Sequence, residues 1–138
     1  MDGSVMINYW AVLGAAVASF VIGFLWYGPL FGKQWMKLAG LTPKSMKSMK
    51  MSPGKSMTVG FIATLVTAYV LSNFVHVLGI MTLAAAVQFA FWTWLGLVAP
   101  VQLGSYLWEG KPFKLFVLNT AHNLVALIIM SGILAFWT

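Results

Sequence analysis

Four long apolar stretches alternate with polar connectors along the chain, and this pattern predicts its architecture. The stretches cover about 7–30, 58–78, 81–107 and 113–137. A helix needs about 20 predominantly apolar residues to cross a bilayer, so each stretch is long enough to span one. The third stretch is longer than the usual range of about 17–25 residues and contains Pro100, so we expect it to tilt, kink or project. The sequence therefore predicts an all-α, four-span transmembrane helical bundle within a single domain, 1–138.

The first connector, 31–57, is the only polar segment of any size. Thr42-Pro43 resembles a helix start, with an N-cap threonine and a proline in the first turn, and Pro53-Gly54 resembles a stop. The methionines and lysines between them predict a short interfacial helix, with methionine in lipid and lysine at the headgroups. The serines in the same run favour a mobile segment equally. The lysines expected to meet anionic lipid headgroups are Lys44, Lys47, Lys50 and Lys55.

Charge gives the expected orientation. Only 7% of residues are charged, against about 25% in soluble domains. All eight basic residues are lysines, six in the first connector and two, Lys111 and Lys114, in the connector after the third stretch. Lysine accumulates in cytoplasmic loops, so we expect a protein of the inner membrane with both termini outside. Nucleic acid is not an expected partner, because no aromatic residues interleave with the connector lysines.

Small residues recur at every fourth position of the first two stretches. Such a stripe lets helix backbones approach closely inside a membrane. We expect the two stripes to pack against each other, with pairing between subunits as the alternative. The stripes are Ala11, Ala15, Ser19 and Gly23 in the first stretch and Gly60, Thr64, Ala68 and Ser72 in the second.

Polar side chains gather at one depth of the third and fourth stretches, in the half nearest the lysine connectors. The fourth stretch presents Asn119, His122 and Asn123 on one helix face, and Gln102 lies at about the same level of the third. Polar groups in hydrocarbon need partners and usually face the bundle interior. This cluster is either interhelical hydrogen bonding or a ligand site. Two aromatic residues of the third stretch, Trp92 and Tyr106, are further ligand-binding candidates along a groove with Gln102.

The sequence lacks the residues that most catalytic, metal and cofactor sites require. The chain has no cysteine, and no apolar stretch contains a carboxylate, so we predict no catalytic residue, metal site or cofactor. His76 and His122 lie at opposite depths and cannot share a metal. The connector methionines resemble soft copper ligands, but the intervening lysines disfavour a cation. Ser105 lies too far from His122 in depth, roughly 10 Å by helix rise, for a nucleophile–base pair.

Several short segments carry a family resemblance. They are Asn8-Tyr9-Trp10, the run from Leu25 to Lys33, Trp35-Met36, the run from Trp92 to Gly96, and the run from Trp108 to Pro112. With these segments the chain resembles the small bacterial membrane family known as domain of unknown function seventeen sixty-one. The resemblance implies a four-helix integral membrane protein and implies no activity.

Three functional hypotheses follow. The first is a non-enzymatic homo-oligomer that binds or passes a small or lipid-like molecule through the bundle or the oligomer axis. The second is an accessory or structural membrane subunit whose grooves hold a partner helix. The third is a membrane enzyme that acts on a lipid or quinone with His122 as its base.

Overall fold

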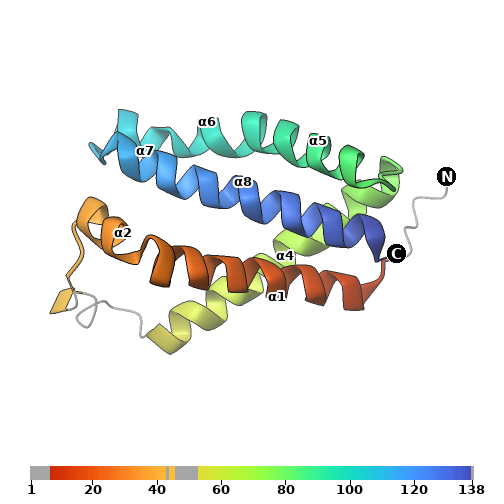
Figure 1. Cartoon of the computed structure of the whole chain (residues 1–138), viewed down its shortest axis with the longest axis horizontal. Coiled ribbons are helices and arrows are strands. Elements are labelled where there is room, and N and C mark those ends of the chain that lie inside the picture. The colour runs from red at the N-terminus through yellow and green to blue at the C-terminus, as the bar shows by residue number, and fades with distance from the viewer. Residues whose placement is uncertain (1–6, 43, 46–52, 138) are drawn as a thin grey trace.

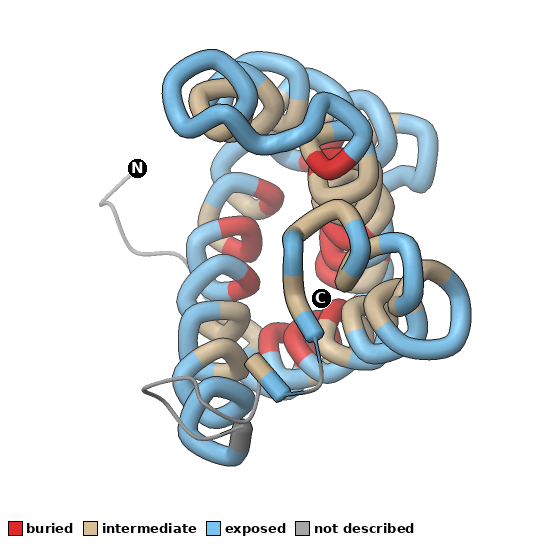
Figure 2. Tube along the Cα trace, turned by 90° about the vertical axis from the view of Figure 1, so that its left-hand side faces the viewer, coloured by how far each residue is buried: buried red, intermediate tan, exposed pale blue. Residues whose placement is uncertain are grey.

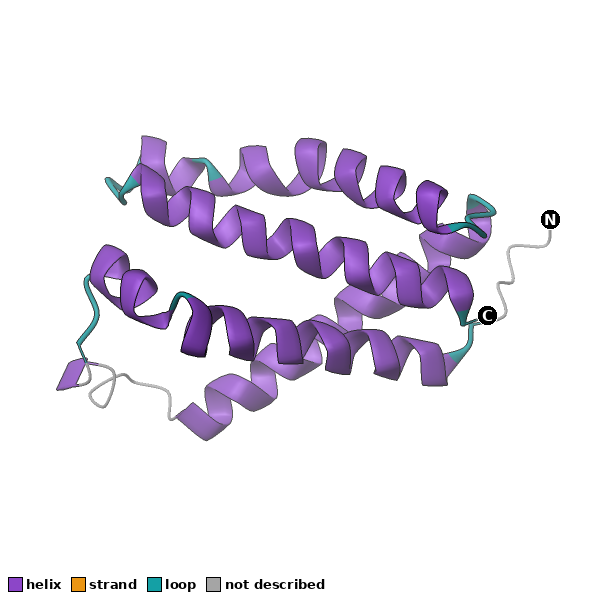
Figure 3. Cartoon of the chain, in the orientation of Figure 1, coloured by secondary structure: helices purple, strands orange, loops and turns teal. Residues whose placement is uncertain are grey.

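Four long apolar helices make up most of the molecule (Figure 1). The computed structural model describes residues 7–42, 44–45 and 53–137. All regular structure within these ranges is helical (Figure 3). Four segments are long and apolar enough to cross a membrane, namely Tyr9–Leu30, Gly54–Val77, Leu83–Leu107 and Phe113–Phe136. The predicted all-α fold is confirmed, and the chain is a small polytopic membrane protein.

The first span is a regular helix followed by a distorted turn. Helix α1 (Tyr9–Leu25) begins at Asn8, whose side-chain oxygen accepts hydrogen bonds from the backbone N–H groups of the next helical turn. It continues into a π-helical turn, η1 (Trp26–Leu30). Gly28 leaves the helical conformation here, with φ −108° and ψ −105°, and Pro29 lacks an N–H group to continue the ladder. Gly28 and Pro29 therefore interrupt the regular helix of the first span.

The short helix of the first connector is α2 (Gly32–Ala39). It ends at Gly40, which has φ 72° and so adopts the left-handed conformation that favours glycine. The backbone N–H of Leu41 donates to the carbonyl of Met36 at 2.8 Å, which completes a Schellman C-cap. A short helix was predicted in this connector. Helix α2 lies in the connector but precedes the segment between Thr42 and Gly54 for which the helix was predicted.

The predicted interfacial segment is described only at its edges. Thr42 behaves as the expected N-cap, because its hydroxyl accepts a hydrogen bond from the backbone N–H of Ser45 at 3.0 Å. Pro53 and Gly54, expected to end this helix, instead form the first turn of α4 (Pro53–Val77). Of the predicted headgroup lysines, Lys44 and Lys55 are exposed, whereas Lys47 and Lys50 lie outside the described residues.

The third span is interrupted, as predicted. Helix α5 (Leu83–Thr93) leads into a second π-helical turn, η2 (Trp94–Val98), and then into two single-turn helices, α6 (Ala99–Gln102) and α7 (Gly104–Leu107). Pro100 lies in the first turn of α6, where its missing N–H group breaks no hydrogen bond of that helix. The last span, α8 (Phe113–Phe136), is continuous.

Helix α8 is the centre of the bundle, because it packs against α1, α4 and α5. Seen from the connector end, buried residues face the space between the helices (Figure 2). Most of these residues lie in the half of the bundle nearest the chain ends. They include Ala15 and Ala16 of α1, Ala68 and Val75 of α4, Ala86 and Ala90 of α5, and Met130 and Leu134 of α8.

The first and last described parts of the chain meet at this packed end of the bundle. The amide nitrogen of Asn8 donates a hydrogen bond to the backbone carbonyl of Trp137 at 3.3 Å. The two lysine connectors lie together at the opposite end (Figure 1). The relative arrangement therefore agrees with the pattern from which orientation was predicted.

The small-residue stripes are buried only in the half of the bundle nearest the chain ends. There α1 contacts α4, and Ala11, Ala15, Ala68 and Ser72 are buried. The prediction is wrong at Gly23, where an added Cβ would lie 3.4 Å from Nε2 of His122 and meet no atom of α4 within 4 Å. The reason is that α4 diverges from α1 towards its Pro53 end (Figure 1).

Candidate functional site

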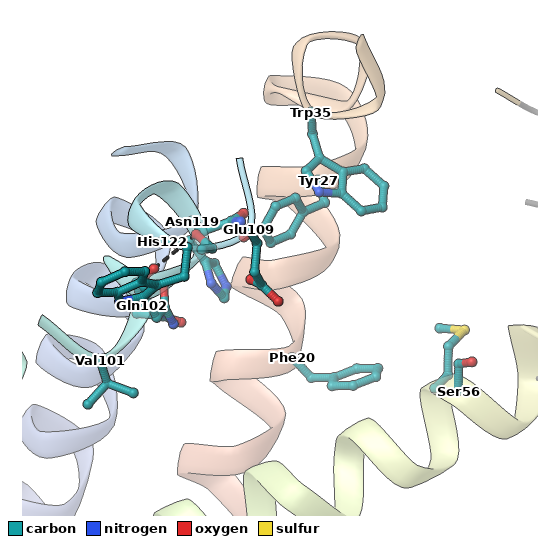
Figure 4. Close-up of a pocket in the computed structure, with 14 residues that line it drawn as sticks. Phe20, Tyr27, Trp35, Ser56, Val101, Gln102, Glu109, Asn119 and His122 are labelled. Carbon is teal, nitrogen blue, oxygen red and sulfur yellow. Dashed lines mark hydrogen bonds between the residues drawn. The ribbon is translucent and has the colours of Figure 1, made fainter. Parts of the chain in front are cut away.

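A cavity of about 1100 Å³ lies in the connector half of the bundle (Figure 4). Its rim includes the exposed residues Ser56, Trp108 and Glu109, which lie at or beside the two lysine connectors. The cavity therefore opens at this end. Much of its wall is apolar or aromatic, with side chains from Phe20, Trp35, Met57 and Val101.

The floor carries the polar side chains that the sequence placed at one depth. Gln102 of α6 and Asn119, His122 and Asn123 of α8 all line this cavity. In Figure 4, Gln102, Asn119 and His122 lie close together, and Phe20 and Ser56 stand across the opening. The predicted cluster is thus brought together and faces the bundle interior.

Tyr27 fixes one of these amides from the opposite helix. Its hydroxyl donates a hydrogen bond to Oδ1 of Asn119 at 2.7 Å. The Tyr27 ring also lies against His122, with ring centroids 5.1 Å apart, and against Trp35 at 5.2 Å. Because the amide oxygen of Asn119 is held by Tyr27, its nitrogen remains a donor for other partners.

His122 holds a central position among the cavities. Its Nε2 is buried and has no hydrogen-bond partner within the described part of the chain. A buried polar atom without a partner is costly and needs an explanation. His122 also lines two smaller cavities, of about 320 and 280 Å³. The imidazole therefore stands where the three spaces meet.

Two tryptophans hold α8 in place beside this site. The indole N–H of Trp26 donates to the carbonyl of Leu118 at 3.2 Å, and that of Trp94 donates to the carbonyl of Thr120 at 2.7 Å. Each tryptophan is the first residue of a π-helical turn, η1 or η2. Such turns occur often at functional sites. Here they aim an indole from each side at the segment of α8 that carries the polar floor.

Two of the residues suggested by sequence lie elsewhere. Trp92 is 66% exposed and stacks edge-on against Phe91. Tyr106 packs against Phe113, with ring centroids 5.3 Å apart. Neither lines the three cavities described above, so the structure does not join them to Gln102.

Sequence reasoning missed several residues of the site. Tyr27 and Trp26 carry an aromatic pattern typical of a membrane interface, which hid their contacts with α8. Trp35 and Glu109 belong to connectors, where no periodic pattern indicated that they face a cavity. The available signal was the W-x-G sequence shared by Trp26–Gly28 and Trp94–Gly96, since both copies form π-helical turns against the same helix.

Comparison with known proteins agrees with the architecture and assigns no activity. No curated protein and no solved structure matches the chain. A family model described as Protein of unknown function (DUF1761) matches residues 10–135, which is nearly the whole chain. This match confirms the resemblance carried by the aromatic segments. The chain therefore belongs to the family described as Protein of unknown function (DUF1761).

Proposed function

We propose that this protein binds a small molecule in the connector-end cavity without transforming it. The observation that carries the proposal is the buried, unpartnered Nε2 of His122 in the wall of that cavity. A ligand group placed there gains a hydrogen bond that the protein itself does not supply. Sites of this kind combine apolar walls with a few convergent polar groups, which is the composition found here.

The charges of the lining favour a ligand that is uncharged where it meets the floor. Within the described part of the chain, Glu109 is the only charged side chain that lines any of the three cavities. It stands at the exposed rim, whereas the floor offers the amides of Gln102, Asn119 and Asn123. Amides and imidazole supply donors and acceptors without net charge. A buried ion without a counter-charge is strongly disfavoured.

Binding is better supported than passage or catalysis. The second cavity ends against Ala126, Leu127 and Met130, beyond which α8 enters the packed core. The second cavity therefore stops where the packed core begins. The neighbours of His122 are amides and aromatic rings, and no carboxylate of the described chain orients the imidazole as a general base usually requires.

We also propose that the open end faces the cytoplasm of the inner membrane and that the protein forms a homo-oligomer. The lysine bias supports the orientation. Lysines at this end favour anionic headgroups by about 1 kcal/mol each near the surface. Large apolar side chains cover the outside of the bundle, among them Val17, Val21, Ile62 and Val66, and they are available to lipid or to a second copy.

The test is native mass spectrometry of the protein released from lipid nanodiscs, comparing His122→Ala with Thr120→Ala. Thr120 is buried two residues away, and its hydroxyl donates within its own helix, to the carbonyl of Phe116 at 2.7 Å. We expect a small-molecule adduct on the wild type and on Thr120→Ala, and a marked loss of it on His122→Ala. A wild type without adduct, or equal adduct on all three proteins, would contradict the proposal.

A further inference from the structure

We infer that the ligand is an uncharged amphiphile, with a hydrocarbon tail and a carbonyl- or hydroxyl-bearing head, and that it enters sideways from the membrane between α1 and α4. This inference rests on the proposed binding function and names its ligand class and its route. The head would lie on the His122 floor. The tail would extend through the gap between the two helices.

The gap between α1 and α4 is a cavity of about 280 Å³ that adjoins the main cavity. Both are lined by Phe20, Met57 and His122. On its outer side the gap is bordered by Phe24, which is 67% exposed, and Met57, which is 51% exposed. The gap therefore connects the polar floor with the outer surface of the bundle.

The outer surface at this level is expected to be hydrocarbon. Gly60 borders the gap and lies six residues into the candidate span Gly54–Val77, which is about 9 Å along the helix axis. The exposed neighbours of Gly60 on α4, Val59 and Ile62, are apolar. An opening at this depth admits a molecule dissolved in the bilayer more readily than one dissolved in water.

Two glycines leave the gap open. A Cβ at Gly60 would lie 3.9 Å from the Phe20 ring, and one at Gly23 would lie 3.4 Å from Nε2 of His122. The space beside the two glycines is therefore bounded by the Phe20 ring and the His122 imidazole. Neither glycine has a side chain that would fill it. A narrow hydrocarbon chain fits such a slot.

Three threonines of α4 use their hydroxyls within their own helix. The hydroxyls of Thr58, Thr64 and Thr67 donate to carbonyls four residues earlier in α4 itself, at 2.9, 2.8 and 3.2 Å. The buried apolar residues of α4 begin at Ala68. The buried apolar contacts of α4 therefore lie beyond the gap, and beside the gap α4 meets α1 through the edge-to-face pair of Phe61 and Phe20.

The two ends of the ligand match two different surroundings. The α1–α4 gap has mostly apolar walls, which suits a tail. The second cavity, of about 320 Å³, brings Gln102, Asn123 and Thr64 around His122, which suits a hydrogen-bonding head. No described lysine lines these spaces, so a phosphate head would find no counter-charge, and an ammonium head would find none beside His122.

Three photoactivatable probes test the ligand class. They share one sixteen-carbon diazirine tail and differ only in the head, which is an alcohol, a sulfate ester or a trimethylammonium group. The full chain is reconstituted in phosphatidylcholine vesicles and irradiated with each probe. We expect the alcohol to label peptides of α1 and α4 that line the gap, at least about tenfold more than either charged probe, because a buried unpaired charge is costly.

Two variants test the route. Gly60→Trp places a large side chain in the gap, whereas Val59→Trp adds the same side chain at a neighbouring position that is 55% exposed and lines none of the cavities. In Gly60→Trp we expect labelling of the gap peptides by the alcohol probe to fall about tenfold, because the probe can no longer bind in the gap. In Val59→Trp we expect this labelling to persist.

The outcomes separate the inference from the proposed function. Equal labelling by the three probes overturns the ligand class. Labelling of the unmodified protein outside the gap peptides overturns the route. Both conclusions hold whatever the two variants show. Undiminished labelling in Gly60→Trp also overturns the route. In each case an adduct that still depends on His122 in native mass spectrometry leaves the proposed binding function standing, with a ligand that enters from the connector end.

Discussion

Replacing Tyr27 with phenylalanine tests whether the floor of the cavity is fixed from α1. The change removes one oxygen atom, the donor of the 2.7 Å hydrogen bond to Oδ1 of Asn119. The aromatic ring stays, so its contacts with His122 and Trp35 are retained. The substitution therefore isolates one polar contact between the first and last spans.

The expected loss follows from the geometry. A distance of 2.7 Å is close to the ideal for an O–H···O hydrogen bond. Such a bond between neutral groups contributes about 0.5–1.5 kcal/mol in proteins generally, and about 0.6 on average between membrane helices. Because both side chains are half-buried, water only partly replaces the lost donor. We expect the free energy of unfolding to fall by about 1 kcal/mol.

The assay is reversible unfolding by sodium dodecyl sulfate in mixed micelles, arranged as a double-mutant cycle of Tyr27→Phe with Asn119→Ala. Tyr9→Phe is the matched control, because Tyr9 is 68% exposed and its hydroxyl has no hydrogen bond with a described residue. A coupling energy near zero, or a loss for Tyr9→Phe as large as that for Tyr27→Phe, would refute the assignment of this contact.

Two further predictions concern packing and orientation. Gly14→Ala should lower the thermal stability, because its Cβ would lie 2.7 Å from the Trp137 ring and overpacking costs about 1–3 kcal/mol. Gly60→Ala has room, so the better helix propensity of alanine should raise the stability by up to about 1 kcal/mol, and melting temperatures in the reverse order would contradict the packing. For orientation, an impermeant maleimide added to whole cells should label Leu78→Cys and not Lys111→Cys, and the opposite result would invert the topology. Because the chain has no native cysteine, only the introduced cysteine of this protein can react, and the purified protein reports it directly.

The spans could be predicted because the bilayer sets their length and composition. Each long helix needed only a run of apolar residues and a polar boundary, and both are visible in the sequence. Helix α2 was not predicted separately, and its clearest local signal is Gly40 at its C-cap. Most of the segment for which the short helix was predicted lies outside the described residues. The start of α4 at Pro53 was missed because proline marks a helix start as readily as a stop.

The polar floor could be predicted and the aromatic half of the site could not. Asn119, His122 and Asn123 share a face by simple helix periodicity, and the depth of Gln102 follows from counting residues. Tyr27 lies in a π-helical turn, η1. The next residue, Gly28, leaves the helical conformation, so the periodicity of α1 does not extend into the connector that carries Trp35. Tyr27 itself has the aromatic character of a membrane interface, and this gave no indication of its contact with Asn119.

The arrangement of hydrogen bonds explains how a bundle can be hollow at one end and remain ordered there. The indole N–H groups of Trp26 and Trp94 donate to backbone carbonyl oxygens of α8 and so hold it to η1 and η2. Each of these oxygens has two lone pairs, and the helix uses only one of them. These contacts leave the helical ladder of α8 intact, so they fix the polar floor at little cost. Helix α4 satisfies its threonines internally and therefore needs no partner across the cavity. A fixed floor opposite a wall whose threonines need no partner across the cavity is the combination that we propose for a site entered from the membrane.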